Sequence, residues 1–542
     1  MNIVGIQIRR YAILVHRWLG VVFCVLFAVW FISGIVMMYW SYPKVSAETR
    51  LSKSQPLDAS SIRISPAQAY KQIQTLHAPD QVVITMLDGR PVYRFYHGSS
   101  QSLVYADNGE RLANVPPEMS LRIASAWTRQ AAASAKFQGA ITDDDQWTVN
   151  PSVRTLGPFW KWSWPDGQET YISQLTGEVA QNTTRAARIE AYFGAVPHWI
   201  YFTSLRKRDS AWRAVVIWSS GVGVILTLLG LIVGVWLYSP SKQYRFREAR
   251  VSAIPAERWG WRNLIWPKGR SSIPYGGQKR WHTVLGLLFG LVTCTWTLSG
   301  MLSMNPLRWS PAGGGAAVIS ALRGTEWNPT RFENFVPADA LRKVHAVFHP
   351  KELELMFFRS EPIYLATESP GRSAIINASG SVVPALDRQQ TVEALVAGRP
   401  YPLVETRMVE QYESYYVDRH HEKPLPVLFA RFGDPAGSMH YIDLRTGRVV
   451  ESYVKLSRWN RWLYHGLHSM DLPWLYRHRP VWDILVLNLM LGGTALSITS
   501  VIIGWRRLRR KVTLPRPQKY VGTNNSPGTA NESLRTSSRR KS

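Results

Sequence analysis

The sequence is poor in cysteine and lacks the motifs of several common enzyme classes. Its 542 residues include only Cys24 and Cys294, and both lie inside long apolar segments. Disulfide-held outer domains and cysteine clusters for metals are therefore excluded. The three glycines at 313–315 fall in an expected loop, not between a strand and a helix. Flavin or nicotinamide domains, phosphate-binding loops and nucleophile elbows are accordingly not expected.

Formal charge is absent from four apolar segments of 22 to 27 residues. About 20 apolar residues cross a bilayer as a helix, and aromatic residues favour the depth of the headgroups. Helices buried in a soluble protein rarely run this far without a charge, so we predict four transmembrane helices in a lipid bilayer. The absence of Asp, Glu, Lys and Arg from these four segments argues against a proton-coupled pump. The segments, each bracketed by aromatic residues, are Trp18–Trp40, Ala214–Tyr238, Trp281–Leu307 and Ile484–Trp505.

Positive charge is concentrated outside these segments. The stretch 239–280 holds ten Lys and Arg against two Glu, and the tail 506–542 holds eleven against one. Basic loops stay in the cytoplasm, so both regions and the N-terminus with Arg9 and Arg10 are predicted to be cytoplasmic. The formal net charge of +27 then reflects topology, and no nucleic-acid partner is expected. The far part of the tail has the composition of a disordered segment.

The chain reads as two diverged copies of one half. A His-x-x-Leu-Gly motif begins at His16 and again at His282, and eight identities fall within 23 ungapped positions. His198 and His468 each precede a tryptophan by fourteen residues. Both halves start on the same side of the membrane, so the repeat is parallel, with a pseudo-twofold axis along the membrane normal.

The two outer segments are nearly equal in length, at 173 and 176 residues, and read as α+β. Strand-like alternation runs into turns such as Thr176-Gly177 and Thr446-Gly447, which predicts β-hairpins. Ser65 is a predicted helix N-cap ahead of Pro66. The predicted order is 1–40 (N-terminus and first helix), 41–213 (outer domain 1), 214–238 (second helix), 239–280 (basic loop), 281–307 (third helix), 308–483 (outer domain 2), 484–505 (fourth helix) and 506–542 (basic tail).

Further motifs flank the outer histidines: Pro197-His-Trp-Ile-Tyr-Phe-Thr-Ser-Leu-Arg206, Gly466-Leu-His-Ser-Met-Asp-Leu-Pro473 and Arg479-Pro-Val-Trp-Asp483. With the two His-x-x-Leu-Gly helix openings and the PepSY-like hairpins, they resemble the PepSY-associated transmembrane family over roughly residues 8–511. Members are often described as iron-regulated or iron-uptake proteins, and one subgroup as di-haem reductases of ferric siderophores. The resemblance implies a bacterial inner-membrane protein whose outer domains are periplasmic.

Four histidines occupy matching positions in the two halves. His16 and His282 open their helices at the cytoplasmic edge, while His198 and His468 lie at the outer edge. Two imidazoles that face each other across the axis form the axial ligand set of a six-coordinate b-type haem. Symmetry alone does not decide between these roles, but with the family resemblance added we expect two haem b groups, their iron held by His16 with His282 and by His198 with His468. His465 is an alternative outer ligand, and the plain alternative for every one of them is hydrogen bonding near the headgroups.

Two classes of function fit these features. In the first, which the resemblance implies, the protein is an oxidoreductase that passes electrons through two haems to a ferric siderophore or other ferric chelate outside. The electron donor is unknown, either a membrane quinol or a separate cytoplasmic reductase. Ferrous iron binds hard oxygen ligands less tightly, so reduction would release the metal for iron uptake. In the second, a non-enzymatic PepSY-domain protein binds a peptide or partner in a regulatory role, or assists iron transport. The sequence identifies no catalytic side chain for either class.

Overall fold

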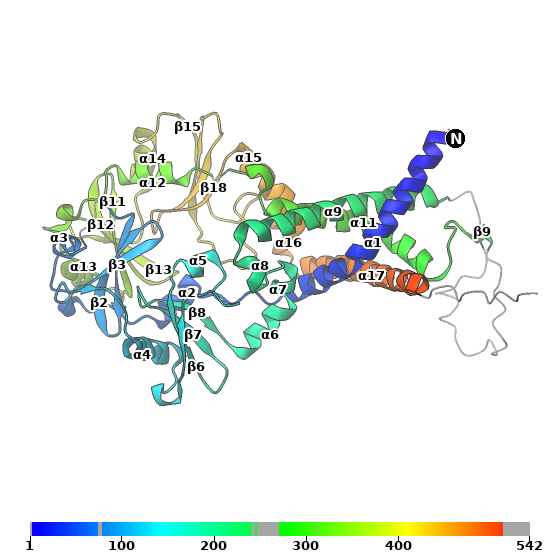
Figure 1. Cartoon of the computed structure of the whole chain (residues 1–542). Coiled ribbons are helices and arrows are strands. Elements are labelled where there is room, and N and C mark those ends of the chain that lie inside the picture. Colours follow the sequence, from blue (N-terminus) through cyan, green and yellow to red (C-terminus); the bar gives the residue numbers. More distant parts are fainter. Residues whose placement is uncertain (1–2, 74–77, 240–243, 246–269, 312, 513–542) are drawn as a thin grey trace, which may run out of the picture.

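A computed structural model describes residues 3–73, 78–239, 244–245, 270–311 and 313–512. Long helices form one end of the molecule, and β-sheets with short helices form the other (Figure 1). Most of the predicted basic loop 239–280 and the predicted tail from 513 onward lie outside the described residues.

Four long helices coincide with the four predicted apolar segments. Each is long and apolar enough to cross a bilayer, which fits a membrane protein. All four begin before the predicted windows, and the last also ends beyond its window, because charged and polar residues that flank an apolar run can continue a helix. The helices are α1 (Ile3–Met37), α9 (Asp209–Leu237), α11 (Gly277–Ser303) and α17 (Arg479–Val512).

The bundle repeats the two-fold relation of the sequence. α1 packs against α9 and α17, and its repeat mate α11 packs against α17 and α9. Small residues let the helices approach closely, as is usual for helices packed in membranes. An added Cβ at Gly223 on α9 would lie 2.8 Å from Thr297 on α11, and one at Gly290 on α11 would lie 2.9 Å from Leu231 on α9.

One eight-stranded antiparallel sheet joins the two outer segments, in the order β14-β13-β12-β11-β1-β2-β3-β4. Its central pairing sets Val83 of β1 opposite Glu354 of β11. These residues are 271 positions apart, as are Tyr93 and Tyr364, so Val83 and Glu354 are repeat mates that pair with each other. The repeat axis therefore passes through this pairing. The strands are β1 (Gln81–Leu87), β2 (Arg90–His97), β3 (Ser100–Tyr105), β4 (Arg111–Leu112), β11 (Glu352–Phe358), β12 (Glu361–Ser369), β13 (Arg372–Ile376) and β14 (Val382–Val383).

Each half also contributes a four-stranded antiparallel sheet. The predicted hairpins at Gly177 and Gly447 connect β7 to β8 and β17 to β18, and both glycines have φ of +67°, which suits glycine. The strands are β5 (Lys136–Ile141), β6 (Phe159–Ser163), β7 (Glu169–Ser173), β8 (Val179–Thr183), β15 (Leu403–Val409), β16 (Val427–Phe432), β17 (Met439–Asp443) and β18 (Arg448–Tyr453). A short ribbon pairs β9 (Tyr244–Arg245) with β10 (Arg270–Ser271).

Short helices cover the sheets and lead into the bundle. The predicted cap at Ser65 is confirmed, because Ser65 and Gln68 form a reciprocal capping box at the start of α3. The helices are α2 (Ala47–Lys53), α3 (Pro66–Lys71), α4 (Pro117–Thr128), α5 (Pro151–Arg154), α6 (Arg185–Phe193), α7 (Ala195–His198), α8 (Thr203–Arg206), α12 (Gly315–Arg323), α13 (Pro337–Val344), α14 (Arg388–Ala397), α15 (Lys455–Asn460), the π-helix η6 (Arg461–Gly466) and α16 (Pro473–Arg477). Turns of 3-10 helix are η1 (Ala59–Ser61), η2 (Ala132–Ser134), η4 (Pro306–Arg308) and η5 (Pro329–Phe332).

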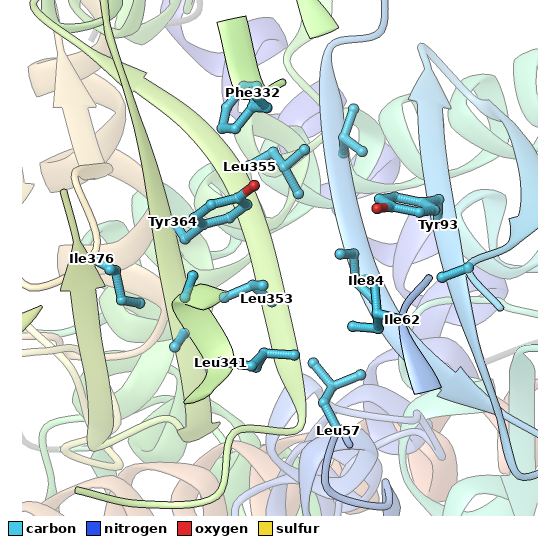
Figure 2. Close-up of a cluster of buried hydrophobic side chains, with 14 of the residues drawn as sticks. Leu57, Ile62, Ile84, Tyr93, Phe332, Leu341, Leu353, Leu355, Tyr364 and Ile376 are labelled. Carbon is cyan, nitrogen blue, oxygen red and sulfur yellow. The ribbon is translucent and has the colours of Figure 1, made fainter. Parts of the chain in front are cut away.

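The main outer core is built from both halves. Figure 2 shows side chains from β1 and β2 meeting side chains from β11, β12 and α13 on one face of the large sheet. Fully burying each such side chain stabilises the fold by about 1.5–3 kcal/mol. The shared core ties the two outer segments together. Its labelled members are Leu57, Ile62, Ile84, Tyr93, Phe332, Leu341, Leu353, Leu355, Tyr364 and Ile376.

Candidate functional site

The first pair of predicted ligands meets at the bundle end far from the sheets, here called the inner end. α1 carries His16 and α11 carries His282, with ring centroids 6.2 Å apart and 37° between the ring planes. Nδ1 of His16 lies 3.0 Å from the carbonyl oxygen of Leu226, and Nδ1 of His282 lies 3.2 Å from the hydroxyl of Ser500. A ring held through Nδ1 presents Nε2 to a metal.

A cavity of about 920 Å³, here called the inner cavity, lies beside this pair. Its wall includes Gly230, where an added Cβ would lie 2.7 Å from Cε1 of His16. Glycine at this position is therefore what allows the ring to sit where it does. No Asp or Glu of the described residues lines the cavity, whereas four cations do: Arg17, Lys279, Arg506 and Arg507. Apolar walls with basic groups suit a flat apolar ring that carries carboxylates.

The second pair meets at the outer end of the bundle. His198 ends α7 and His468 follows η6, and their ring centroids are also 6.2 Å apart, with 63° between the planes. Nδ1 of His198 lies 3.1 Å from both the Ser33 hydroxyl and the Trp30 carbonyl oxygen. Nδ1 of His468 lies 3.0 Å from the hydroxyl of Ser299, which is the repeat mate of Ser33. Both halves thus fix the outer ring in the same way.

Burial keeps the outer pair uncharged. Loss of hydration lowers the pKa of His198 and of His468 to about 4 each. Both rings are then neutral near pH 7, which is the form that binds a metal. Two glycines lie against these rings: an added Cβ would lie 3.4 Å from Cε1 of His198 at Gly34 and 3.7 Å from Cε1 of His468 at Gly300.

A second cavity, of about 320 Å³ and here called the outer cavity, lies beside the outer pair. Among the described residues, no Lys, Arg, Asp or Glu lines it. Phe27 and Thr293 line both the inner and the outer cavity, so they separate the two sites. The aromatic wall is formed by Phe27, Trp30, Phe31, Trp199, Tyr201, Trp212, Trp296 and Tyr464.

The spacing within each pair fits one metal ion between two rings. A ligating imidazole nitrogen lies about 2 Å from its metal and roughly 1 Å from its own ring centre, so trans ligands place their centroids about 6 Å apart. Both pairs measure 6.2 Å. Two protein nitrogens on opposite sides leave the equatorial positions to a porphyrin. The residues present therefore fit a bis-histidine haem at each end, and the ligand role itself stays a prediction.

The alternative ligand His465 is placed differently from His468. Its half-exposed ring lies beside Asp471, with 3.8 Å between Nδ1 and a carboxylate oxygen. The ring that faces His198 is that of His468. His465 belongs to the π-helix η6, whose extra residue per turn orients the chain before His468.

Sequence reasoning missed the groups that hold the histidines. Ser33 and Ser299 stand out as repeat mates, and that relation was the available indication of a shared role. The sequence gives no such indication for the Leu226 carbonyl oxygen, because every residue has a main-chain carbonyl whatever its side chain. Gly230 has Ser500 as its repeat mate, so symmetry did not reveal it either.

Comparison with known proteins adds no assignment. No family model matches the chain, and no curated protein matches it either. Function must therefore be inferred from the two histidine pairs and the cavities beside them.

Proposed function

We propose that this chain is a di-haem electron-transfer protein of the bacterial inner membrane that reduces a ferric siderophore or other ferric chelate on the periplasmic side. In this proposal it belongs to the PepSY-associated transmembrane family. The observation that carries the proposal is the pair of symmetric histidine sites, each with a 6.2 Å centroid separation, at the two ends of one helical bundle.

The chain's own residues have distinct tasks at each site. His16 with His282, and His198 with His468, would hold the iron through imidazole nitrogens. The inner cations, among them Arg17, would pair with the propionates. Haem held in this way carries single electrons by changing between ferric and ferrous iron.

The two sites lie at different depths along the same helices. Fourteen residues of α1 separate His16 from Trp30, whose carbonyl oxygen contacts His198. At 1.5 Å per residue the layers are about 21 Å apart along the helix. That separation covers most of a hydrocarbon core of about 30 Å, so two haems give an electron path across it. The donor at the inner end is a membrane quinol or a cytoplasmic reductase.

A polar cavity of about 970 Å³, here called the sheet cavity, lies between the large sheet and the two small-sheet hairpins. Glu178 after one hairpin turn pairs with Arg50 at 3.5 Å and Arg94 at 3.8 Å. Its repeat mate Arg448 pairs with Glu354 at 2.6 Å. More basic than acidic side chains line this cavity, which suits an anionic chelate docked between the outer segments.

The proposal is tested with haem-loaded protein in lipid nanodiscs, reduced without oxygen and mixed with a ferric chelate and a ferrous-specific dye. Each electron reduces one ferric ion, so two ferrous ions per protein are expected as the spectrum returns to its oxidised form. The His468→Ala variant should lose this transfer while the inner site keeps its spectrum. A haem-loaded, reduced protein that no ferric chelate reoxidises would contradict the reductase function and favour a binding or regulatory role.

A further inference from the structure

Two short helices at the outer end of the bundle expose apolar side chains. On α6, Ile189, Tyr192 and Phe193 are 49%, 52% and 70% exposed, at the i, i+3, i+4 spacing of one helix face. On α15, Leu456 and Trp459 are 54% and 62% exposed, three residues apart. Side chains of this size, grouped on one face, indicate a surface that is covered in the working protein.

The two helices are repeat mates that share chemistry but not sequence. Two cations and one exposed apolar residue recur at an offset of 270, while the apolar side chain changes from aliphatic to indole. A protein partner that recognises the shape of this surface would need the same side chains on both helices. A lipid surface requires only apolar groups beside cations. The matching pairs are Arg185/Lys455, Arg188/Arg458 and Ile189/Trp459.

Both helices lie where the long helices end. α6 leads into Gly194, where an added Cβ would lie 2.9 Å from Val36 near the outer end of α1. α15 continues into η6, which packs against α11. Figure 1 shows α6 and α15 on opposite sides of the bundle's outer end. Trp199, Phe202 and Trp474 are also exposed in the segments next to them, and aromatic residues favour headgroup depth.

We propose that α6 and α15 lie in the headgroup layer of the outer leaflet and hold the outer histidines at a fixed depth. Their apolar faces reach the acyl-chain boundary, and the exposed cations Arg185 and Lys455 face lipid phosphates, whereas Arg188 pairs with Glu169. His198 follows the end of α6 by five residues, and His468 follows the end of α15 by eight. Lipid contact on both sides therefore positions both halves of the outer site. The inference rests on the membrane location of the bundle and needs no haem.

Site-directed labelling tests this proposal in the full chain. Cys24 and Cys294 are both buried, so a maleimide fluorophore reports an introduced cysteine, with the unsubstituted protein as the labelling blank. Phe193→Cys and Trp459→Cys place the probe on the two helices. Val396→Cys on α14, 54% exposed, is the matched control in the outer segments. Each protein is reconstituted in vesicles of phosphatidylethanolamine and phosphatidylglycerol.

The two helix probes should emit at shorter wavelength than the control. Spin-labelled lipid should quench them several-fold more than iodide does, with the reverse order at Val396→Cys. Probes that iodide quenches as readily as the control would overturn the proposal. Probes shielded from both quenchers would also overturn it, because they would show contact with protein. Ile189→Cys serves α6 if Phe193→Cys fails to fold, and the haem spectrum is scored separately.

Discussion

Replacing Gly230 by alanine should remove the inner haem and leave the outer one. The new Cβ would lie 2.7 Å from Cε1 of His16, whereas ordinary contacts begin at 3.4 Å, so the ring must move by about 0.7 Å. Side chains that bind a metal or cofactor must lie within about 0.5 Å of their productive positions. Movement also strains the hydrogen bond from Nδ1 to the Leu226 carbonyl oxygen. Disturbing such a bond costs about 10- to 100-fold in affinity, or roughly 1.4–2.7 kcal/mol.

The assay is the haem-to-protein ratio at limiting haem, which should fall from two toward one. Gly221→Ala is the control on the same helix, since its Cβ would meet Met301 Sδ at an ordinary 3.5 Å. Alanine favours a helix by about 0.8–1.0 kcal/mol over glycine in both variants, so a loss confined to Gly230→Ala cannot come from helix propensity. Two haems with an unchanged spectrum in Gly230→Ala would refute the placement of haem beside His16.

Three further predictions concern the outer site, the path between the sites and the outer segments. Ser299→Ala removes the hydroxyl that holds His468, so the ligand becomes less basic and the midpoint potential of the outer haem should rise while the inner value stays constant. Phe27→Leu should slow electron exchange between the haems in stopped-flow measurements at an unchanged haem ratio, because Phe27 lines both cavities; an unchanged rate would show that it lies off the path. Burial lowers the pKa of His440 to about 4. Between pH 6.5 and pH 4 only the unfolded chain binds a proton at this histidine, so the free energy of unfolding should fall by up to about 3 kcal/mol over that range. Thermal unfolding of His440→Gln should lack this pH dependence of stability, and an equal pH dependence in both proteins would contradict the assignment to His440.

The helices were predictable because their information is local. Uncharged runs of 22 to 27 residues mark all four, and turn residues such as Gly177 mark the hairpins. Even the facing of His16 with His282 followed from the repeat, since a two-fold axis brings equivalent positions together.

The joining of the halves in one sheet was not predictable in the same way. Val83 pairs with Glu354, and neither residue carries a mark of a partner 271 positions away. Strand pairing across a repeat axis is decided by packing of the shared core, in which Tyr93 and Tyr364 are both fully buried. The ring-holding carbonyl of Leu226 and the charge pairing of the sheet cavity likewise depend on three-dimensional proximity.

The most direct test of the central claim is a reduced-minus-oxidised visible spectrum of the purified protein, with its haem-to-protein ratio. Protein expressed with ample haem should show two b-type haems, and His16→Ala and His468→Ala should each lose about one, the inner and the outer respectively. A folded protein that remains colourless under these conditions would contradict the account.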